Sequence, residues 1–325
     1  MKIRVAVTAL LIAALGAAAV VYFANEPATR TQLVQAWSLL PKESYRAMGV
    51  TDPFVSWSPD SRSVVFGLYG LHSHAYKIFL WKVGDKQLEY VTAGVSPSFL
   101  SNDEIIYLKK QPSGKAAGIF RRNLRTRSES EVAVALKNND FFTDLTGFSY
   151  DQKHKTLQVC MVEYTRFRTP GPEEYDLNGN FVRPVSSRLG EGIVDYSFDP
   201  TGRRCAIMVR ERYTRPVSLQ LADGNSSRGR EIARGKINAV AWSPNGSTVA
   251  YAEGKEVIAL NPQTLERTVV ARFGDPSDEK DGRYVARLEW SPNSRYLAAF
   301  VYVPNLAGDY PLYYVLDMSE LQERD

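Results

Sequence analysis

The pair of residues whose spacing best suits metal chemistry is His72-Ser-His74, in the stretch LYGLHSHAYK. Alternate residues of a strand share a face, so both imidazoles could bind one ion. A tight or catalytic site needs a third ligand, and the chain holds only one further histidine, His154. The competing interpretation, which we favour, is two polar residues in a surface loop flanked by aromatics. We therefore expect no bound metal and no cofactor.

Two charged segments invite other chemistry. The acidic loop DPSDEKDGR, residues 275–283, clusters carboxylates, but it also contains Lys280 and Arg283 and lacks the alternation of a calcium loop. The segment KKQPSGKAAGIFRRNLRTR, residues 109–127, has seven positive charges and no acid, as a nucleic-acid site could have. We interpret both as solvated surface, the second with at most a weak attraction to anionic lipid. No nucleic-acid partner is expected.

The sequence gives little support for a catalytic serine or cysteine nucleophile. A serine hydrolase of the nucleophile-elbow type needs G-x-S-x-G, and the chain does not contain it. Cys160 and Cys205 could pair in an oxidising compartment, but two small buried hydrophobic residues are the favoured interpretation. We predict no catalytic residue.

The N-terminus predicts export. Residues 5–24, VAVTALLIAALGAAAVVYFA, are an uncharged apolar run of twenty that follows Lys2 and Arg4. At 1.5 Å per residue such a run reaches about 30 Å, enough to cross a bilayer core. It is either a signal anchor or a signal peptide cleaved after small residues near Ala19, and both place the rest of the chain outside the cytosol. We assign residues 1–25 to this segment and favour the anchor.

The following residues 26–44 have leucine, valine and tryptophan at partly helical spacing and stop at Pro41. We expect a juxtamembrane linker with a short helix, followed by a globular body over residues 45–325. With 44% hydrophobic and 23% charged residues and a net charge of +4, this body can bury a sizeable core and is only weakly basic.

A phrase of an aromatic, a tight turn and a strand recurs six times. Its versions are VSWSPDSRSVVF, PSFLSNDEIIYL, TGFSYDQKHKTLQV, YSFDPTGRRCAIMV, VAWSPNGSTVAYA and LEWSPNSRYLAAF. The anchoring aromatics are Trp57, Phe99, Phe148, Phe198, Trp242 and Trp290, at steps of 42, 49, 50, 44 and 48 residues. A period in the forties predicts a repeat architecture. In the best versions, Pro59, Asp60, Pro200, Pro244 and Pro292 form the turn.

Each unit continues with one or two further strand patterns, such as KIFLWKV from Lys77 and QLEYVTA from Gln87. Four strands per unit around a common axis is a β-propeller, here with six blades. The sixth unit has three strands before the chain ends. We expect SYRAMGV, residues 44–50, to supply its outer strand and so close the ring.

The phrases WSPDS, FDPTG, WSPNG and WSPNS resemble the WD40-like (PD40) repeat of the TolB propeller family. The same repeat occurs in the propellers of prolyl oligopeptidase and dipeptidyl peptidase IV relatives. The resemblance covers about residues 45–318 and is weak in the second and third units, which lack the Ser-Pro pair. It implies an all-β, six-bladed propeller used mostly for binding proteins or peptides. A hydrolase domain would need further chain, so oligopeptidase activity is not implied.

Binding is expected on one face of the ring. Turns after the second and fourth strands share a face, and the longer insertions lie there: residues 68–76, 163–176, 274–283 and 303–311. The first and sixth units are neighbours in a closed ring, so their loops could share a rim. The candidate binding residues are His72, His74, Tyr76, Arg166, Phe167, Tyr302 and Tyr310.

The sequence thus predicts a membrane-anchored or secreted propeller, outside the cytosol and in bacteria periplasmic, that binds a protein or peptide of the cell envelope without catalysis. The alternative is a metal-assisted carbohydrate-active enzyme, a lyase or hydrolase, that uses His72 and His74.

Overall fold

The structure is a computed structural model. It describes residues 29–31, 33–39, 48–49, 55–70, 75–110, 116–132, 143–151, 155–163, 173–177, 181–184, 193–210, 216–223, 226, 229–274, 282–303 and 310–322. No helix in this part of the chain has the length and hydrophobicity needed to cross a membrane.

The described strands form six sheets, each built mainly from consecutive antiparallel strands. The first sheet contains β4 (Val55–Trp57), β5 (Ser63–Gly70), β6 (Ala75–Lys82) and β7 (Glu89–Ala93). The second contains β8 (Val95–Ser101), β9 (Glu104–Lys110), β10 (Ala116–Asn123) and β11 (Glu129–Val132), and the third contains β12 (Thr143–Asp151), β13 (Thr156–Glu163), β14 (Glu173–Asp176) and β15 (Phe181–Pro184). The fourth contains β16 (Ile193–Phe198), β17 (Arg204–Val209), β18 (Val217–Asp223) and β19 (Arg230–Gly235). The last two contain β20 (Ile237–Trp242), β21 (Val249–Glu253), β22 (Glu256–Leu260) and β23 (Arg267–Arg272); and β24 (Tyr284–Trp290), β25 (Tyr296–Val303) and β26 (Tyr310–Asp317), followed by the short helix α2 (Ser319–Gln322).

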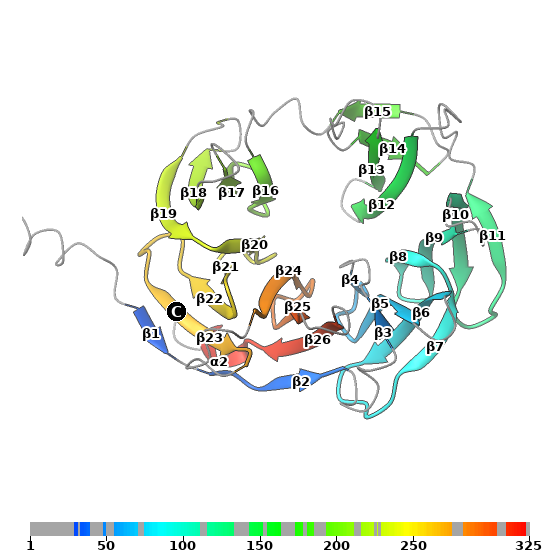
Figure 1. Cartoon of the computed structure of the whole chain (residues 1–325), viewed down its shortest axis with the longest axis horizontal. Helices are drawn as coiled ribbons and strands as arrows, with labels where there is room; N and C mark the ends of the chain where they lie inside the picture. The colour runs from blue at the N-terminus through cyan, green and yellow to red at the C-terminus, as the bar shows by residue number, and fades with distance from the viewer. Residues whose placement is uncertain are drawn as a thin grey trace, which may run out of the picture.

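The sheets stand around a common centre, with the first strand of each nearest to it (Figure 1). These inner strands touch in succession from β16 through β20, β24, β4 and β8 to β12. The hydrophobic core lies between neighbouring sheets. One cluster joins Ala252 and Val257 of the fifth sheet to Leu297 and Leu312 of the sixth. The fold is therefore a β-propeller, as the repeat predicts.

The Ser-Pro turns are held by the serine as well as by the proline. Ser58 Oγ donates to Asp60 Oδ1 at 2.6 Å and accepts from the amide of Ser63 at 2.9 Å. The same pair of bonds connects Ser243 to Asn245 and Thr248, and Ser291 to Asn293 and Tyr296. The prolines lie in the turns as predicted: Pro59, Pro200, Pro244 and Pro292. Because the serine hydroxyls are buried and fully used, the phrase is structural.

In the fourth sheet Asp199 takes the place of the serine. Its Oδ1 accepts from the amides of Arg203 at 2.9 Å and Arg204 at 3.1 Å, while Thr201 Oγ1 donates to the same carboxylate. Burial acts to raise the pKa of Asp199, but these hydrogen bonds and the charge of Arg204 outweigh it and hold the pKa below its ordinary value. The turn needs its carboxylate ionised.

The fourth position of these turns is left-handed, with φ of 61° at Ser61 and Ser294, 70° at Gly202 and 80° at Gly246. Glycine adopts this conformation freely, whereas a serine is strained in it. Each serine is compensated by a bond between sheets: Ser61 Oγ accepts from the Asn293 amide at 3.0 Å and Ser294 Oγ from the Asn245 amide at 2.9 Å. The turns of neighbouring sheets are thus joined directly.

Two of the tryptophan anchors also join sheets. The indole Nε1 of Trp57 donates to the carbonyl of Glu289 in the sixth sheet at 3.0 Å, and that of Trp290 to Ala241 in the fifth at 3.1 Å. Trp242 differs, because its indole donates to Gly246 of its own turn at 3.3 Å beneath the guanidinium of Arg204. Phe198 packs in a cluster with buried Cys205 and Ile207 of its own sheet.

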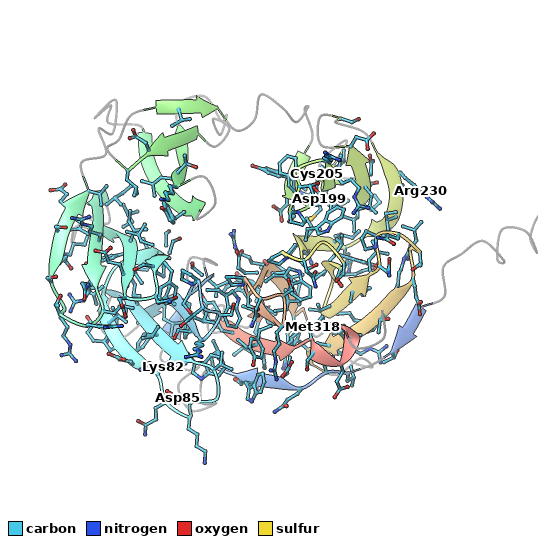
Figure 2. All side chains as sticks on the ribbon, turned by 180° about the vertical axis from the view of Figure 1, so that it is seen from behind. Lys82, Asp85, Asp199, Cys205, Arg230 and Met318 are labelled. Atoms are coloured by element: carbon cyan, nitrogen blue, oxygen red, sulfur yellow. The ribbon has the colours of Figure 1, made fainter. Side chains whose placement is uncertain are left out.

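Cys205 is fully buried as a free thiol, and burial raises its pKa to about 12. Figure 2 shows it close to Asp199 on the inner side of the fourth sheet, while Arg230 points away from the ring. The interpretation of a small buried hydrophobic residue is confirmed for Cys205. The side chain of Cys160 lies outside the described part.

The N-terminal residues correct the prediction of ring closure. Strand β1 (Thr29–Thr31) pairs in parallel with β23, and β2 (Ala36–Ser38) pairs antiparallel with β26 as the outer strand of the sixth sheet. We call residues 29–39 the strap. They come from the stretch predicted as a linker with a short helix. Val34 is buried against the fifth and sixth sheets, and Leu39 against the sixth and first. An N-terminal strand does complete the sixth sheet, but it is not residues 44–50.

Of residues 44–50, the structure describes β3 (Met48–Gly49). It pairs with Tyr69 and Gly70 at the end of β5, in the first sheet. The sequence predicts that the nearest upstream segment, residues 44–50, pairs with the incomplete sixth sheet. The chain instead uses a segment further upstream, whose apolar side chains fit between the outer strands.

Candidate binding pocket on the fifth sheet

The predicted rim residues are only partly described. His72, His74, Arg166 and Phe167 lie outside the described residues. Tyr76, Tyr302 and Tyr310 lie within strands β6, β25 and β26 rather than in loops, because strands extend into the segments that we expected to be insertions. Glu173–Asp176 likewise forms β14.

The two rim tyrosines with described side chains belong to different clusters. Tyr76 packs beside Val95 between the first and second sheets, while Tyr302 contacts Tyr284 with ring centroids 4.9 Å apart. No described contact joins Tyr76 to Tyr302. The rim as a single binding surface stays a prediction.

Three of the seven cations of the basic segment pair with two carboxylates of their own sheet. Lys109 and Arg122 both pair with Glu129, and Arg125 pairs with Asp103 at 2.7 Å. Cations that already have acidic neighbours offer little net attraction to a polyanion. These contacts support the interpretation as solvated surface.

Among the described residues no group of three or more histidine, cysteine or acidic side chains could hold a metal ion. The histidines of the alternative hypothesis lie outside this part of the chain. Residues 275–281 of the acidic loop also lie outside it.

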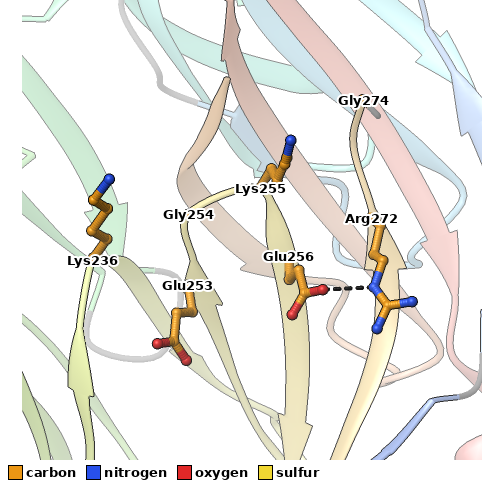
Figure 3. Close-up of a pocket in the computed structure, with 7 residues that line it drawn as sticks. All are labelled: Lys236, Glu253, Gly254, Lys255, Glu256, Arg272 and Gly274. Atoms are coloured by element: carbon orange, nitrogen blue, oxygen red, sulfur yellow. Dashed lines mark hydrogen bonds and ion pairs between the residues drawn. The ribbon is translucent and has the colours of Figure 1, made fainter. Parts of the chain in front are cut away.

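A pocket of about 320 Å³ opens at one end of the fifth sheet, between the connection from β19 to β20, the turn between β21 and β22, and the end of β23. It lies at the turns after second and fourth strands, the face on which we expected binding. Its lining consists of Lys236, Glu253, Gly254, Lys255, Glu256, Arg272 and Gly274 (Figure 3).

Two glycines shape the pocket. Gly254 has φ of 58°, and its amide donates to the Lys236 carbonyl at 2.8 Å while its carbonyl accepts from the Val285 amide at 2.9 Å. One turn residue thereby ties three sheets together. At Gly235, a Cβ would stand 2.7 Å from the carboxylate of Glu253, so the missing side chain leaves room for this acid.

Two of the charges of the pocket form an ion pair. Glu256 accepts from Arg272 Nε at 2.6 Å, and Arg272 also reaches Thr31 Oγ1 of the strap at 3.3 Å. Burial raises the pKa of Glu253, and Arg267 opposes the shift. In Figure 3 the amines of Lys236 and Lys255 extend beyond the strand ends, away from the carboxylates.

Charged groups of both signs line this pocket. Its described lining offers ammonium groups, a guanidinium and carboxylates, but no thiol, imidazole or hydroxyl. Mixed charges at the edge of a concave surface match the polar groups of another polypeptide. Of these residues only Gly274 lies in a segment predicted for binding, 274–283, because the others belong to short turns and strand ends rather than long loops. The available signal was the charged hairpin Glu253-Gly-Lys-Glu256, placed on the same face.

No protein-family model matches the chain, and no curated protein sequence is detectably similar to it. Solved structures do share its fold. An oligogalacturonate lyase in complex with manganese is 11% identical over 90% of this chain and 95% of that one, with a TM-score of 0.54. A gluconolactonase from Xanthomonas campestris is 8% identical over 89% of this chain and 91% of that one, with a TM-score of 0.50.

TolB from Acinetobacter baumannii is 18% identical over 66% of this chain, with a TM-score of 0.44, and the chain spans about half of its length, 52%. At these identities the likenesses show a fold and no activity, and the TolB match is too distant to carry an argument. The class that fold and pocket define is a β-propeller protein. The prediction of a β-propeller is confirmed at the level of the fold.

Proposed function

We propose that the protein is a six-bladed propeller, held at the outer side of a membrane by residues 5–24, that binds a protein or peptide of the cell envelope. The charged pocket on the fifth sheet supports this function, because it lies on the face opposite the Ser-Pro turns and its lining can pair with charged groups of both signs on a polypeptide. The six described sheets would be the six blades, with the strap completing the sixth.

The strap sets how close the propeller would lie to the membrane. Strand β1 begins at Thr29, five positions after the apolar run ends at Ala24. Five extended residues reach about 17 Å. An inserted run would therefore hold the edge of the fifth sheet near the lipid, without a long stalk.

Site-specific photocrosslinking tests the binding face. A photoreactive phenylalanine analogue replaces Lys236 or Lys255 in the full chain, expressed in cells of its source. We expect discrete crosslinked products from both positions.

The matched control is Lys86, which is exposed in the turn between β6 and β7 on the opposite face. Products from Lys86 with none from the two pocket positions would place binding on the Ser-Pro face and refute the choice of face. Protease added outside the cytoplasmic membrane should digest the propeller, and protection would contradict the proposed location.

A further inference from the structure

The inner strands β16, β20 and β24 lie side by side towards the centre of the ring (Figure 1). A second cavity, of about 200 Å³, lies between them. It is separate from the pocket on the fifth sheet and shares no lining residue with it. Charged side chains enter it from the fourth and sixth sheets: Asp195, Arg287 and Glu289.

These three groups interact across the cavity. Arg287 Nη2 lies 3.6 Å from Glu289 Oε2 on the same strand, and its charge also acts on Asp195 two sheets away. Asp195 in turn accepts the amide of Tyr196 at 2.9 Å and is bonded by the amide of Val240. Two carboxylates share one guanidinium, so one negative charge remains uncompensated within the cluster.

The repeat shows how the cavity arises. When the phrases are aligned on their anchors, Arg287 and Glu289 correspond to Ala239 and Ala241 in the fifth sheet. Two methyl groups stand where the sixth sheet carries long charged chains. This leaves the space over β20 open, and Arg287 can act across it on Asp195.

The carboxylates are confined but reachable by water. Glu289 is surrounded by protein, yet 40% of its side-chain surface is accessible, as in a narrow channel. Burial raises the pKa of both Asp195 and Glu289, and Arg287 opposes the shift in each. The charge of Asp195 raises the pKa of Glu289 further. A cation between them would supply the missing charge in a place where water solvates it poorly.

We propose that this channel cavity binds a primary ammonium group, carried by a lysine side chain or the N-terminus of a peptide. An ammonium has three donors and can be satisfied by two carboxylates. A calcium ion needs six to eight oxygen ligands, which the described lining does not offer, and Arg287 would repel it. The cavity volume suits an alkylammonium chain rather than a folded domain.

Ligand-observed NMR titration of the full chain in detergent tests this assignment. The probe is Nα-acetyl-lysine methylamide, and the matched probe is Nα-acetyl-norleucine methylamide, which has the same chain length without the charge. We expect the lysine probe to bind and the norleucine probe not to bind. Glu289→Gln and Asp195→Asn should each weaken lysine binding by at least about ten-fold, as expected for a poorly solvated charge pair.

The control variant is Glu89→Gln, the same charge change at an exposed position on β7, which should leave the affinity unchanged. If Glu289→Gln does not fold, the affinity of Asp195→Asn for the lysine probe tests the proposal. The affinity of the wild-type chain should also fall when salt is added. Equal binding of both probes, unchanged affinity in both channel variants, or displacement of the lysine probe by stoichiometric calcium would each overturn the proposal. Because the pocket on the fifth sheet is untouched, these results leave the crosslinking test independent.

Discussion

The strap makes a sharp prediction about stability, because it contains two leucines in opposite environments. Leu39 is 4% exposed and packs among Trp57, Tyr313 and their neighbours at the junction of the sixth and first sheets. Its amide donates to the Tyr313 carbonyl at 2.9 Å. Leu33, six residues earlier, is 62% exposed. Leu39→Ala should therefore destabilise the propeller, and Leu33→Ala should not.

The size of the effect follows from burial. Replacing a buried leucine by alanine costs about 2–5 kcal/mol, and about 3 kcal/mol is expected at the end of a short strand. For a domain of roughly 280 residues the entropy of unfolding is about 0.6 kcal/mol per degree, so the melting temperature Tm should fall by about 5 °C. An exposed leucine to alanine change stays within about 0.5 kcal/mol, or less than about 1 °C.

Thermal unfolding followed by circular dichroism measures both variants under the same conditions. Removal of residues 29–39 should lower Tm further than Leu39→Ala, because it exposes β26 and the core beside it. If Leu39→Ala and Leu33→Ala melt within 1 °C of each other, the strap does not seal the ring and the reasoning fails.

Three further predictions concern the repeat. Trp57→Phe removes the bond to the Glu289 carbonyl and should cost about 1–2 kcal/mol, seen as a lower urea midpoint; an unchanged midpoint would mean that this bond adds nothing. Ser294→Gly and Ser294→Ala both lose the hydroxyl, but at φ of 61° alanine keeps the backbone strain and glycine does not. The glycine variant should therefore be more stable to unfolding by about 1 kcal/mol. Equal stabilities would refute the strain argument. Asp199 has a lowered pKa in the folded state, so its contribution is present above its unfolded pKa and is lost as pH falls through the folded one. Asp199→Asn should lower Tm at pH 7, and the difference from wild type should shrink below about pH 4; a difference independent of pH would contradict it.

Local chemistry made most of the fold predictable. A turn such as WSPDS specifies its own geometry through neighbours in sequence, since Ser58, Asp60 and Ser63 are bonded to one another. Strand patterns between the turns were equally local. Even the second and third units, which lack the Ser-Pro pair, form four-stranded sheets where the spacing predicts them.

The strap was not predictable in the same way. Residues 29–31 and 36–38 are too short to show a period, and their partners lie more than 230 residues away in β23 and β26. Which upstream segment fills an open sheet depends on side-chain fit at the end of the ring. Leu39 and Val34 satisfy that fit, and their spacing in the sequence gives no sign of it.

The candidate sites escaped prediction for a different reason. The pocket on the fifth sheet is made from three short segments that are separate in the sequence, so no single segment indicates it. The channel cluster did leave a trace. Position 289 holds a glutamate where other phrases have small residues, as at Ser56, Ser197 and Ala241.

The way in which neighbouring sheets are joined explains why position 289 can hold a glutamate. Between the first and second sheets, Ser56 Oγ accepts from the Phe99 amide at 3.1 Å, and between the fourth and fifth, Ser197 Oγ accepts from the Trp242 amide at 2.8 Å. The residue before the anchor must then be a serine for the junction to form.

The junctions on either side of the sixth sheet use a different bond. There the indoles of Trp290 and Trp57 donate to the main-chain carbonyls of residues 241 and 289, and every residue type provides a carbonyl. The side chains at these two positions therefore take no part in the junction. Ala241 leaves space for the channel cavity, and Glu289 places a carboxylate in it. At the tryptophan junctions the side chain before the anchor takes no part in joining the sheets, and Glu289 lies at one of these positions.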